Sequence, residues 1–371
     1  MWRFIQPAEI RFGCGEALKM PDILKSLGME DKKGIIVSSA SFVKNGTAEK
    51  IAELCGIDDI FSGISQNPDV SEADRCADRI REIKAEYIIA IGGGSVIDCA
   101  KAASVVCLTD KPAAHFHGTK APLPNEHIPV IAVPTTAGTG SEVTGVSVLT
   151  NRRTGLKAPI GGTCLYPVCA VIDPELTYSV PKHITANTGM DVLCHAVEGY
   201  WSTGHQPICD ALAERAAGLV FENLVKLYEY PQDKNAREKM CEASVLAGLA
   251  FALPKTTSSH ACSFPLTNDY GIPHGEACAL TLDSFMRINA SQDDGRLLDF
   301  AKRLGFSTVE QMADKVYEMK IRMNMRVDLK DLHLSKEAVG RLVKACRSPN
   351  LLNNPVPVTD EMLYCMFKAM L

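Results

Sequence analysis

Four side chains in the second half of the chain have the types and the spacing of a metal site. Asp191 and His195 are four residues apart in a segment, residues 187–201, that is predicted to be helical, so both side chains lie on one helical face. His260 and His274 follow, fourteen residues apart. One carboxylate and three imidazoles can bind Fe²⁺, Zn²⁺, Mn²⁺ or Co²⁺ and leave a position for a substrate oxygen. Each histidine alone would more often be structural, and it is the set of four that favours a metal.

A glycine-rich turn in the first half is a candidate phosphate site. Residues 87–91 are predicted to form a strand, which runs into the glycines and serine of residues 92–95 and then into a helical segment, residues 96–106. A strand, a glycine turn and a helix offer free backbone N–H groups and the positive end of a helix to a phosphate. The turn lacks both the Gly-x-Gly-x-x-Gly pattern and a Walker lysine, so a simple tight connection is the alternative.

A second loop, residues 134–142, strengthens the prediction of a nucleotide site. Its sequence, PTTAGTGSE, follows a predicted strand at residues 128–133 and is rich in hydroxyl groups and glycine. Doubly wound sheets bind ligands at the carboxyl ends of their strands. A polar surface turn would not explain why both loops follow strands in the same half of the chain, so together they favour dinucleotide binding.

The elements that must position these residues divide the chain into two parts. Short apolar runs rich in β-branched residues predict parallel strands that are buried on both faces, with helical patterns such as residues 70–84 between them. The opening segment, residues 4–12, alternates weakly and is predicted to form a hairpin. From about residue 181 the sequence predicts successive helices. We therefore expect an α/β nucleotide-binding domain at residues 1–180 and an all-helical metal-binding domain at residues 181–371, with ligands in the cleft between them. The four predicted strands are residues 33–38, 87–91, 128–133 and 169–172.

Composition excludes several classes of function. The 371 residues carry a net charge of −5 without a block of like charges, so nothing favours nucleic acid or a membrane surface as a partner. No run approaches the roughly 20 apolar residues of a membrane span, and Pro7 and Glu9 interrupt the segment where a signal peptide would lie. The 14 cysteines are scattered without a Cys-x-x-Cys pair, which is typical of reduced thiols and of a cytoplasmic protein.

Taken in order, these motifs resemble those of the iron-containing (group III) alcohol dehydrogenase family over essentially the whole chain. The matching segments are residues 92–101, 134–144, 189–200, His260 and residues 273–275. The resemblance implies a Rossmann-like N-terminal domain and a helical C-terminal domain, an architecture similar to that of dehydroquinate synthase. It also implies a homodimer, for which residues 4–12 would supply a pairing strand.

The resemblance assigns roles to individual residues. The metal, Fe(II) or alternatively Zn(II), would be held by Asp191, His195, His260 and His274, of which Asp191 and His274 would also be catalytic. Lys157 is expected to reach the nicotinamide ribose of NAD or NADP. The remaining contacts to that nucleotide are expected from Gly93, Gly94, Ser95, Asp98, Thr135, Thr136, Thr139 and Ser141.

Two departures from the family pattern affect the cofactor and the proton path. Many members have an acidic residue after the second strand that repels a 2′-phosphate, but Ser39 and its neighbours carry no carboxylate, so both NAD and NADP remain candidates. Many members also have a histidine four residues after the third metal ligand, where this chain has Phe264. Proton exchange is therefore expected to pass through His274, the ribose hydroxyls and water.

The expected chemistry is hydride transfer between the nicotinamide and a short alcohol or aldehyde. A divalent cation lowers the pKa of a bound alcohol and polarises an aldehyde carbonyl. The sequence around His260 looks most like the branch that reduces phosphonoacetaldehyde, and reducers of sulfoacetaldehyde or succinic semialdehyde look similar. An anionic tail would need Lys255 and the hydroxyls of residues 256–259, although these hydroxyls could instead cap a helix. A plain short alcohol remains an alternative substrate.

Two other classes of function stay open at this point. A metal- and NAD-dependent lyase similar to dehydroquinate synthase shares the architecture, but it needs additional basic residues around a phosphorylated ring. A metal or nucleotide sensor would bind without turnover. Net production of NAD(P)H from an alcohol distinguishes the dehydrogenase from both.

Overall fold

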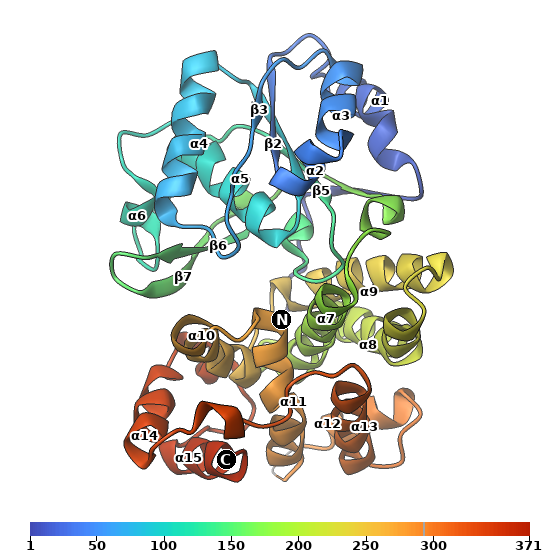
Figure 1. Cartoon of the computed structure of the whole chain (residues 1–371), viewed down its shortest axis with the longest axis vertical. Coiled ribbons are helices and arrows are strands. Elements are labelled where there is room, and N and C mark those ends of the chain that lie inside the picture. Colours follow the sequence, from blue (N-terminus) through green and yellow to red (C-terminus); the bar gives the residue numbers. More distant parts are fainter. Residues whose placement is uncertain (292–293) are drawn as a thin grey trace. The chain divides into compact units, whose positions relative to one another are not determined.

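The computed structural model describes residues 1–291 and 294–371. Contacts divide the chain into two compact units: residues 5–179 form one, and residues 1–4 together with residues 180–371 form the other. The first unit is the α/β layer structure in blue and green in Figure 1, and the second consists of helices. The predicted fold class, an α/β N-terminal part followed by an all-helical C-terminal part, is confirmed.

A parallel sheet of six strands forms the centre of the α/β unit. The strand order is β1-β8-β5-β4-β2-β3, so β4 and β5 lie side by side in the middle. Strands β2, β4, β5 and β8 are buried along their whole length, as their continuous apolar sequences predict. Their bounds are β1 Glu9–Phe12, β2 Gly34–Ser38, β3 Ile60–Phe61, β4 Tyr87–Gly92, β5 Val130–Pro134 and β8 Cys169–Ile172.

Helices cover both faces of this sheet. Apolar residues of α4 (Val70–Ile83) and α5 (Gly94–Val106) pack on one face, and those of α1 (Met20–Ser26) and α3 (Thr47–Cys55) pack on the other. Helix α4 begins with a capping box, in which Asp69 and Glu72 bond reciprocally to backbone N–H groups. The short helices of this unit are α2 (Ala40–Lys44) and α6 (Ala113–Phe116).

Two hairpin assignments differ from the sequence-based expectation. Residues 4–12 do not form a hairpin: β1 instead pairs in parallel with β8, from Glu9 beside Cys169 to Phe12 beside Ile172. The unit does contain an antiparallel hairpin, between β6 (Val146–Asn151) and β7 (Leu156–Gly161), which the sequence analysis did not predict. Alternation alone indicates that a segment is a strand, but the partner of a strand is chosen by the rest of the fold.

The second unit is a helical assembly around α7. This helix is buried on almost every side over its C-terminal half, because α8, α9 and α11 all contact it. The bounds are α7 Lys182–Trp201, α8 Pro207–Glu229, α9 Lys234–Ala252, α10 Ser258–Tyr270, α11 His274–Ala290, α12 Arg296–Arg303, α13 Val309–Arg322, α14 Lys336–Ala345 and α15 Asp360–Ala369.

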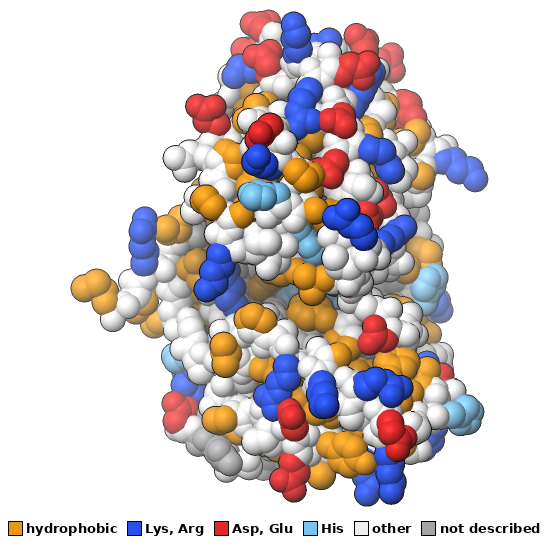
Figure 2. All heavy atoms as spheres, turned by 90° about the vertical axis from the view of Figure 1, so that its left-hand side faces the viewer, with side chains coloured by type: hydrophobic (Ala, Val, Ile, Leu, Met, Phe, Trp, Pro, Cys, Tyr) orange, Lys and Arg blue, Asp and Glu red, His pale blue; other side chains and the backbone are white. Residues whose placement is uncertain are grey.

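None of the helices in the described residues combines the length and the apolar character that crossing a membrane requires. On the face drawn in Figure 2, basic and acidic side chains are interspersed, with apolar side chains between them. This face shows no large region of a single sign that would attract a polyanion.

Candidate metal centre and nucleotide loops

Helix α7 supplies the first two candidate metal ligands. Asp191 and His195 lie four residues apart, and His195 Nε2 is 3.9 Å from Asp191 Oδ1. Both side chains are almost fully buried. The ring of His195 lies between two other rings, stacked on Phe251 at 4.1 Å and on His260 at 4.6 Å between ring centroids. The helical spacing thus does what the sequence predicts and brings both donors to one face.

Helix α10 supplies His260, whose orientation is fixed by a carboxylate. Nδ1 of His260 forms a short contact with Glu198 Oε2, while Nε2 lies 3.5 Å from Asp191 Oδ1. A carboxylate is an acceptor only, so Nδ1 carries a proton, and Nε2 is the nitrogen left for a metal. Glu198, on α7, was missed by the sequence analysis, although its position three residues after His195 places it near the same helical face.

Helix α11 begins at His274, the most exposed of the candidate ligands. Its side chain is 26% exposed, and its Nε2 lies 3.9 Å from Asp191 Oδ1. Gly275 makes this approach possible: a Cβ atom at this position would lie 1.9 Å from the backbone oxygen of Asn187 on α7. Residue 275 must therefore be glycine for α11 to start so close to α7.

The buried polar atoms of this cluster fit a cation. Among the described residues, Asp191 Oδ1 and His260 Nε2 are buried and have no hydrogen-bond partner, yet they face each other. A carboxylate oxygen and an imidazole lone pair are both acceptors, so their approach is unfavourable unless positive charge lies between them. The two donors have the chemistry that a divalent metal requires.

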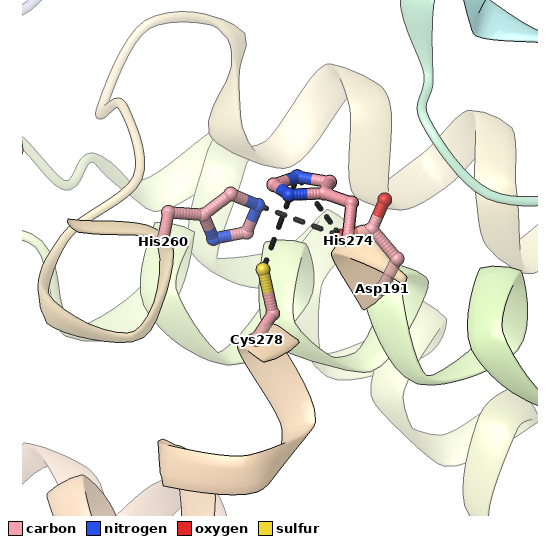
Figure 3. A group of neighbouring side chains, drawn as sticks. All are labelled: Asp191, His260, His274 and Cys278. Carbon is pink, nitrogen blue, oxygen red and sulfur yellow. Dashed lines mark hydrogen bonds and ion pairs between the residues drawn. The ribbon is translucent and has the colours of Figure 1, made fainter. Parts of the chain in front are cut away.

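A thiol also belongs to the cluster. One ligand atom each from Asp191, His260, His274 and Cys278 all lie within 4.8 Å of one another. Figure 3 shows the Cys278 thiol and the two imidazoles pointing toward one another. The donor set predicted from the sequence, oxygen and nitrogen without sulfur, does not include Cys278. The available signal was its spacing of four residues from His274 on one helix, the same spacing that relates Asp191 to His195.

Burial and neighbouring charges set the protonation states of the donors. Burial lowers the pKa of His195 to about 4, so the ring is neutral at pH 7, as a metal ligand must be. Burial would raise the pKa of Asp191, but the neighbouring His195 and His260 hold it below its ordinary value. Asp191 and His195 are thus available in the forms that bind a metal. Burial would lower the pKa of His260, but Cys278, Glu198 and Asp191 hold it well above its ordinary value, so a metal must displace a proton from this ring.

In the α/β unit, the two predicted nucleotide loops lie against each other. Strands β4 and β5 pair with Gly92 beside Pro134, so the turn after β4 and the loop after β5 start at the same edge. A Cβ atom on Gly94 would lie 2.6 Å from Thr139, and one on Gly93 would lie 3.2 Å from Thr136 Oγ1. The glycines therefore allow the hydroxyl-rich loop to pack directly on the glycine turn.

The start of α5 is open to an anion. Its N-cap residue, Gly93, makes no side-chain capping bond, so the first N–H groups of a 13-residue helix lack a side-chain acceptor. Ser95 is in the first turn, Thr135 follows β5, and Ser39 lies beside the end of β4, where its N–H donates to Ile91 O at 3.2 Å. The residues predicted to contact the phosphates are thus gathered at one edge of the sheet.

Two charged residues, Asp98 and the fully buried Lys101, hold the second loop on α5. The Asp98 carboxylate accepts from the Ser141 hydroxyl in a short bond and from the backbone N–H of Val148 at 2.9 Å. Lys101, which is completely buried, donates to Ser141 O at 2.9 Å and, in a short bond, to Val146 O. Asp98 therefore lies beneath the loop as a support, and Lys101 is a residue that the sequence analysis did not single out.

Lys157 lies on the hairpin, on β7 opposite Thr150. Its Nζ donates to Asn67 Oδ1 at 2.9 Å, and Asn67 adopts a left-handed backbone conformation with φ of 53°. Lys157 therefore has a fixed direction within the α/β unit.

The hydroxyl groups before His260 are mostly used inside the fold. Thr257 donates to Glu198, Ser258 donates to Asn354, and Thr256 accepts from Asn350. These bonds hold the turn between α9 and α10, which supports the alternative that the hydroxyls are structural. Lys255 differs, because its Nζ makes one hydrogen bond among the described residues, to Ala252 O at 2.9 Å.

Comparison with known proteins gives consistent matches over both units. Residues 7–174 match the family model described as iron-containing alcohol dehydrogenase, and residues 185–371 match the C-terminal model of the Fe-containing alcohol dehydrogenase family. Alcohol dehydrogenase 4 of Schizosaccharomyces pombe is 31% identical over 99% of this chain and 88% of its own length. The NADPH-dependent butanol dehydrogenase of Clostridium saccharobutylicum is 33% identical over 89% of this chain and 85% of its own length.

Solved structures match the whole chain. The sulfoacetaldehyde reductase of Bifidobacterium kashiwanohense, in complex with NAD+, is 53% identical with a TM-score of 0.97, covering 100% of this chain and 98% of that one. An alcohol dehydrogenase of Oenococcus oeni is 30% identical with a TM-score of 0.93, and all of both chains is covered.

Proposed function

Since this chain belongs to the iron-containing alcohol dehydrogenase family and is therefore a metal-dependent, NAD(P)-linked oxidoreductase, we propose that its substrate is a short aldehyde with an anionic tail, with sulfoacetaldehyde as the first candidate. The observation that carries the proposal is the 53% identity over the whole chain to a structure described as a sulfoacetaldehyde reductase. Phosphonoacetaldehyde, the substrate expected from the sequence around His260, has the same chain length and also an anionic tail, and it is the second candidate.

We further propose that Asp191, His195, His260 and His274 hold the metal. The buried, unpartnered Asp191 Oδ1 and His260 Nε2 support this set. A divalent ion held there would polarise the aldehyde carbonyl in one direction and favour the ionised alcohol in the other. His274 is the ligand with the most exposed side chain, so the proposal places the substrate on its side of the cluster.

The nucleotide is proposed to bind at the two adjacent loops of the α/β unit. Gly93, Gly94 and Ser95 would offer backbone N–H groups to the pyrophosphate at the start of α5. Thr135, Thr136, Thr139 and Ser141 would add hydroxyl donors, and Lys157 would reach the nicotinamide ribose. We propose NAD(H) as the working cofactor, because the sulfoacetaldehyde reductase structure contains NAD+. Ser39 offers no carboxylate to repel a 2′-phosphate, so NADPH is the comparison to make.

Lys255 is the proposed partner of the anionic tail. It lies five residues before His260, and two of the three donors of its ammonium group are free of hydrogen bonds to the described residues. A charge-assisted hydrogen bond contributes about 1.5–3 kcal/mol, which corresponds to about 10–100-fold in binding.

A panel of aldehydes tests the proposal. The metal-free protein is reconstituted with Fe²⁺ or Zn²⁺ without oxygen, and NADH and NADPH oxidation is measured with sulfoacetaldehyde, phosphonoacetaldehyde, succinic semialdehyde and propanal. We expect kcat/KM with sulfoacetaldehyde to exceed that with propanal by at least about tenfold. In Lys255→Met this ratio should fall about tenfold, whereas in Lys336→Met, an exposed lysine on α14, it should not change. Equal values for anionic and neutral aldehydes would overturn the anionic-tail proposal.

We also propose that the protein is a homodimer that pairs through β1. This strand is at the edge of the six-stranded sheet, and among the described residues it pairs only with β8. Its side chains Ile10 and Phe12 are exposed apolar groups, as are Trp2 and Ile5 just before it. An exposed edge with apolar side chains is a template for pairing with another chain.

A further inference from the structure

Glu198 is a buried carboxylate that lies behind the candidate metal ligands and does not belong to them. It is on α7, seven residues after Asp191 and three after His195, and its side chain has no exposed surface. Burying a carboxylate is costly unless hydrogen-bond donors surround it. Its surroundings therefore show what the fold uses it for.

Four donors, and no acceptor, surround this carboxylate among the described residues. Oε1 accepts from the backbone N–H of Ser259 at 2.6 Å, from that of His260 at 3.3 Å and from the Thr257 hydroxyl at 3.0 Å. Oε2 accepts from Nδ1 of His260 in a short bond. Trp201 Nε1 donates to the Thr257 hydroxyl at 2.6 Å, which directs that hydroxyl's own proton toward Glu198. The carboxylate thus binds both the first turn of α10 and the imidazole that α10 carries.

We propose that Glu198 is a positioning residue of the metal centre: it fixes His260 in the tautomer with the proton on Nδ1 and directs Nε2 toward the metal. The proposal rests on the proposed metal set. Its geometric basis is that Glu198 occupies Nδ1, which leaves Nε2 as the ring nitrogen that faces Asp191 Oδ1, at 3.5 Å. A carboxylate on the far nitrogen also makes an imidazole a better donor to a metal.

The first test is Glu198→Gln, which keeps the size of the side chain. A carboxamide has one acceptor oxygen and one donor NH₂, so it cannot accept from both the backbone N–H groups and His260 Nδ1. Either the ring changes tautomer and loses the Nε2 lone pair, or it rotates away. We expect Co²⁺ affinity, measured by competition with a chelator in the absence of nucleotide and aldehyde, to fall about 10–100-fold. The visible spectrum of bound Co²⁺ should change as well.

Glu72→Gln is the matched control. Glu72 is also buried and also surrounded by donors, from the backbone N–H and hydroxyl of Ser65 and the N–H of Asp69, but it caps α4 in the α/β unit. The Glu72→Gln variant should lose about as much stability as Glu198→Gln does, but it should keep the wild-type Co²⁺ affinity and the wild-type Co²⁺ spectrum.

A measurement on the unchanged protein covers the case in which Glu198→Gln does not fold. In wild-type protein with ¹⁵N-labelled histidine and bound Zn²⁺, the His260 signals, assigned by their loss in His260→Gln, should show a proton on Nδ1. A proton on Nε2 in this protein would overturn the proposal. The proposal would also be overturned if the Glu198→Gln variant bound Co²⁺ with the wild-type affinity and spectrum. A wild-type protein that binds no Co²⁺ would overturn the proposed metal set and this inference with it, whereas failure of the aldehyde panel alone would leave both intact.

Discussion

His195 and Cys278 both lie next to the cluster of Asp191, His260 and His274, and they differ in the metals they favour. Imidazole binds iron and zinc alike, whereas thiolate favours zinc and other soft ions. Cys278 Sγ lies 3.9 Å from His274 Nε2, and the Cys278 thiol also forms a hydrogen bond with the buried thiol of Cys194. His195 has a buried Nδ1 without a hydrogen-bond partner among the described residues, and its Nε2 is near Asp191. By distance, Cys278 and not His195 groups with the ligand atoms of Asp191, His260 and His274, within 4.8 Å of one another. We nevertheless propose His195 as the fourth ligand, because its ring is neutral at pH 7 and its Nε2 is near Asp191, with Cys278 as the alternative.

This assignment predicts different results for the two substitutions. His195→Ala should lower Co²⁺ affinity more than about 100-fold. Substituting a residue that only supports a ligand lowers metal affinity by up to about 100-fold, and losing a ligand should lower it further. Cys278→Ser should leave that affinity unchanged, and the wild-type Co²⁺ protein should lack the intense near-ultraviolet absorption of a sulfur–cobalt bond. Chelator competition and absorption spectra of the two variants check this. Strong absorption that disappears in Cys278→Ser would show instead that sulfur is a ligand.

At the residue scale, the sequence predicts best what depends on local spacing. The approach of Asp191 to His195 follows from a helix alone, because residues four apart share a face. Glu198 and Lys101 could not be recognised as partners of His260 and Ser141, since their contacts cross 62 and 40 residues of sequence. Only the packing of helices against each other creates those contacts.

Helices α7 and α11 approach each other closely at Gly275. Alanine at this position would place Cβ 1.9 Å from Asn187 O, which is backbone and cannot rotate away. The start of α11 must then move, and His274 with it. We expect Gly275→Ala to lose about 1–3 kcal/mol of stability and most of its bound metal.

Gly340→Ala provides the control for this prediction. Gly340 lies inside α14, and a Cβ atom there would meet no atom within 4 Å. Since alanine is the better helix former, this variant should gain up to about 1 kcal/mol and keep its metal. Thermal unfolding and metal content are measured for both; a Gly275→Ala protein with full metal content would contradict the close-packing argument.

The loop that Lys101 holds also predicts a dependence of stability on pH. Glu142, in this loop, is buried beside Lys101 and Asp98, and burial raises its pKa from 4.5 to about 7. The folded protein therefore binds a proton that the unfolded chain releases between pH 4.5 and 7, so the contribution of Glu142 to stability is present below this range and is lost as the pH rises through it. The shift corresponds to a loss of up to about 3 kcal/mol.

Glu142→Gln should remove this contribution. The variant should be more stable relative to wild type at pH 7.5 than it is at pH 5, because glutamine does not ionise. Thermal unfolding of both proteins at the two pH values checks this. If the unfolding midpoints of wild type and Glu142→Gln differ by the same amount at pH 5 and at pH 7.5, Glu142 does not titrate in this range.

At the scale of elements, the buried strands are the most predictable feature. The predicted strands at residues 87–91 and 169–172 correspond to β4 and β8, because a strand buried on both faces needs a continuous apolar run. The hairpin of β6 and β7 is a separate two-stranded sheet, in which buried residues alternate with partly or fully exposed ones. Such alternation is a weaker signal, and the same weakness led to the wrong hairpin at residues 4–12.

At the scale of the whole molecule, the free edge of β1 predicts the oligomeric state. The double variant Ile10→Glu with Phe12→Glu should place charges on the edge proposed to pair and give monomers, whereas wild type should sediment as a dimer. Ile321→Glu, which charges an exposed apolar residue of α13, should remain dimeric. Analytical ultracentrifugation distinguishes these outcomes, and a double variant that stays dimeric would place the interface elsewhere.

The proposed metal donors come from three helices, α7, α10 and α11, and span positions 191–274. An ion bonded to all three binds the folded chain far better than the unfolded one, so at 100 times its dissociation constant it would add about 2.7 kcal/mol of stability. The melting temperature would then report how many molecules carry an ion and how tightly each type of ion binds. Two preparations with the same sequence would differ in heat resistance and storage life according to the metal they acquired during growth.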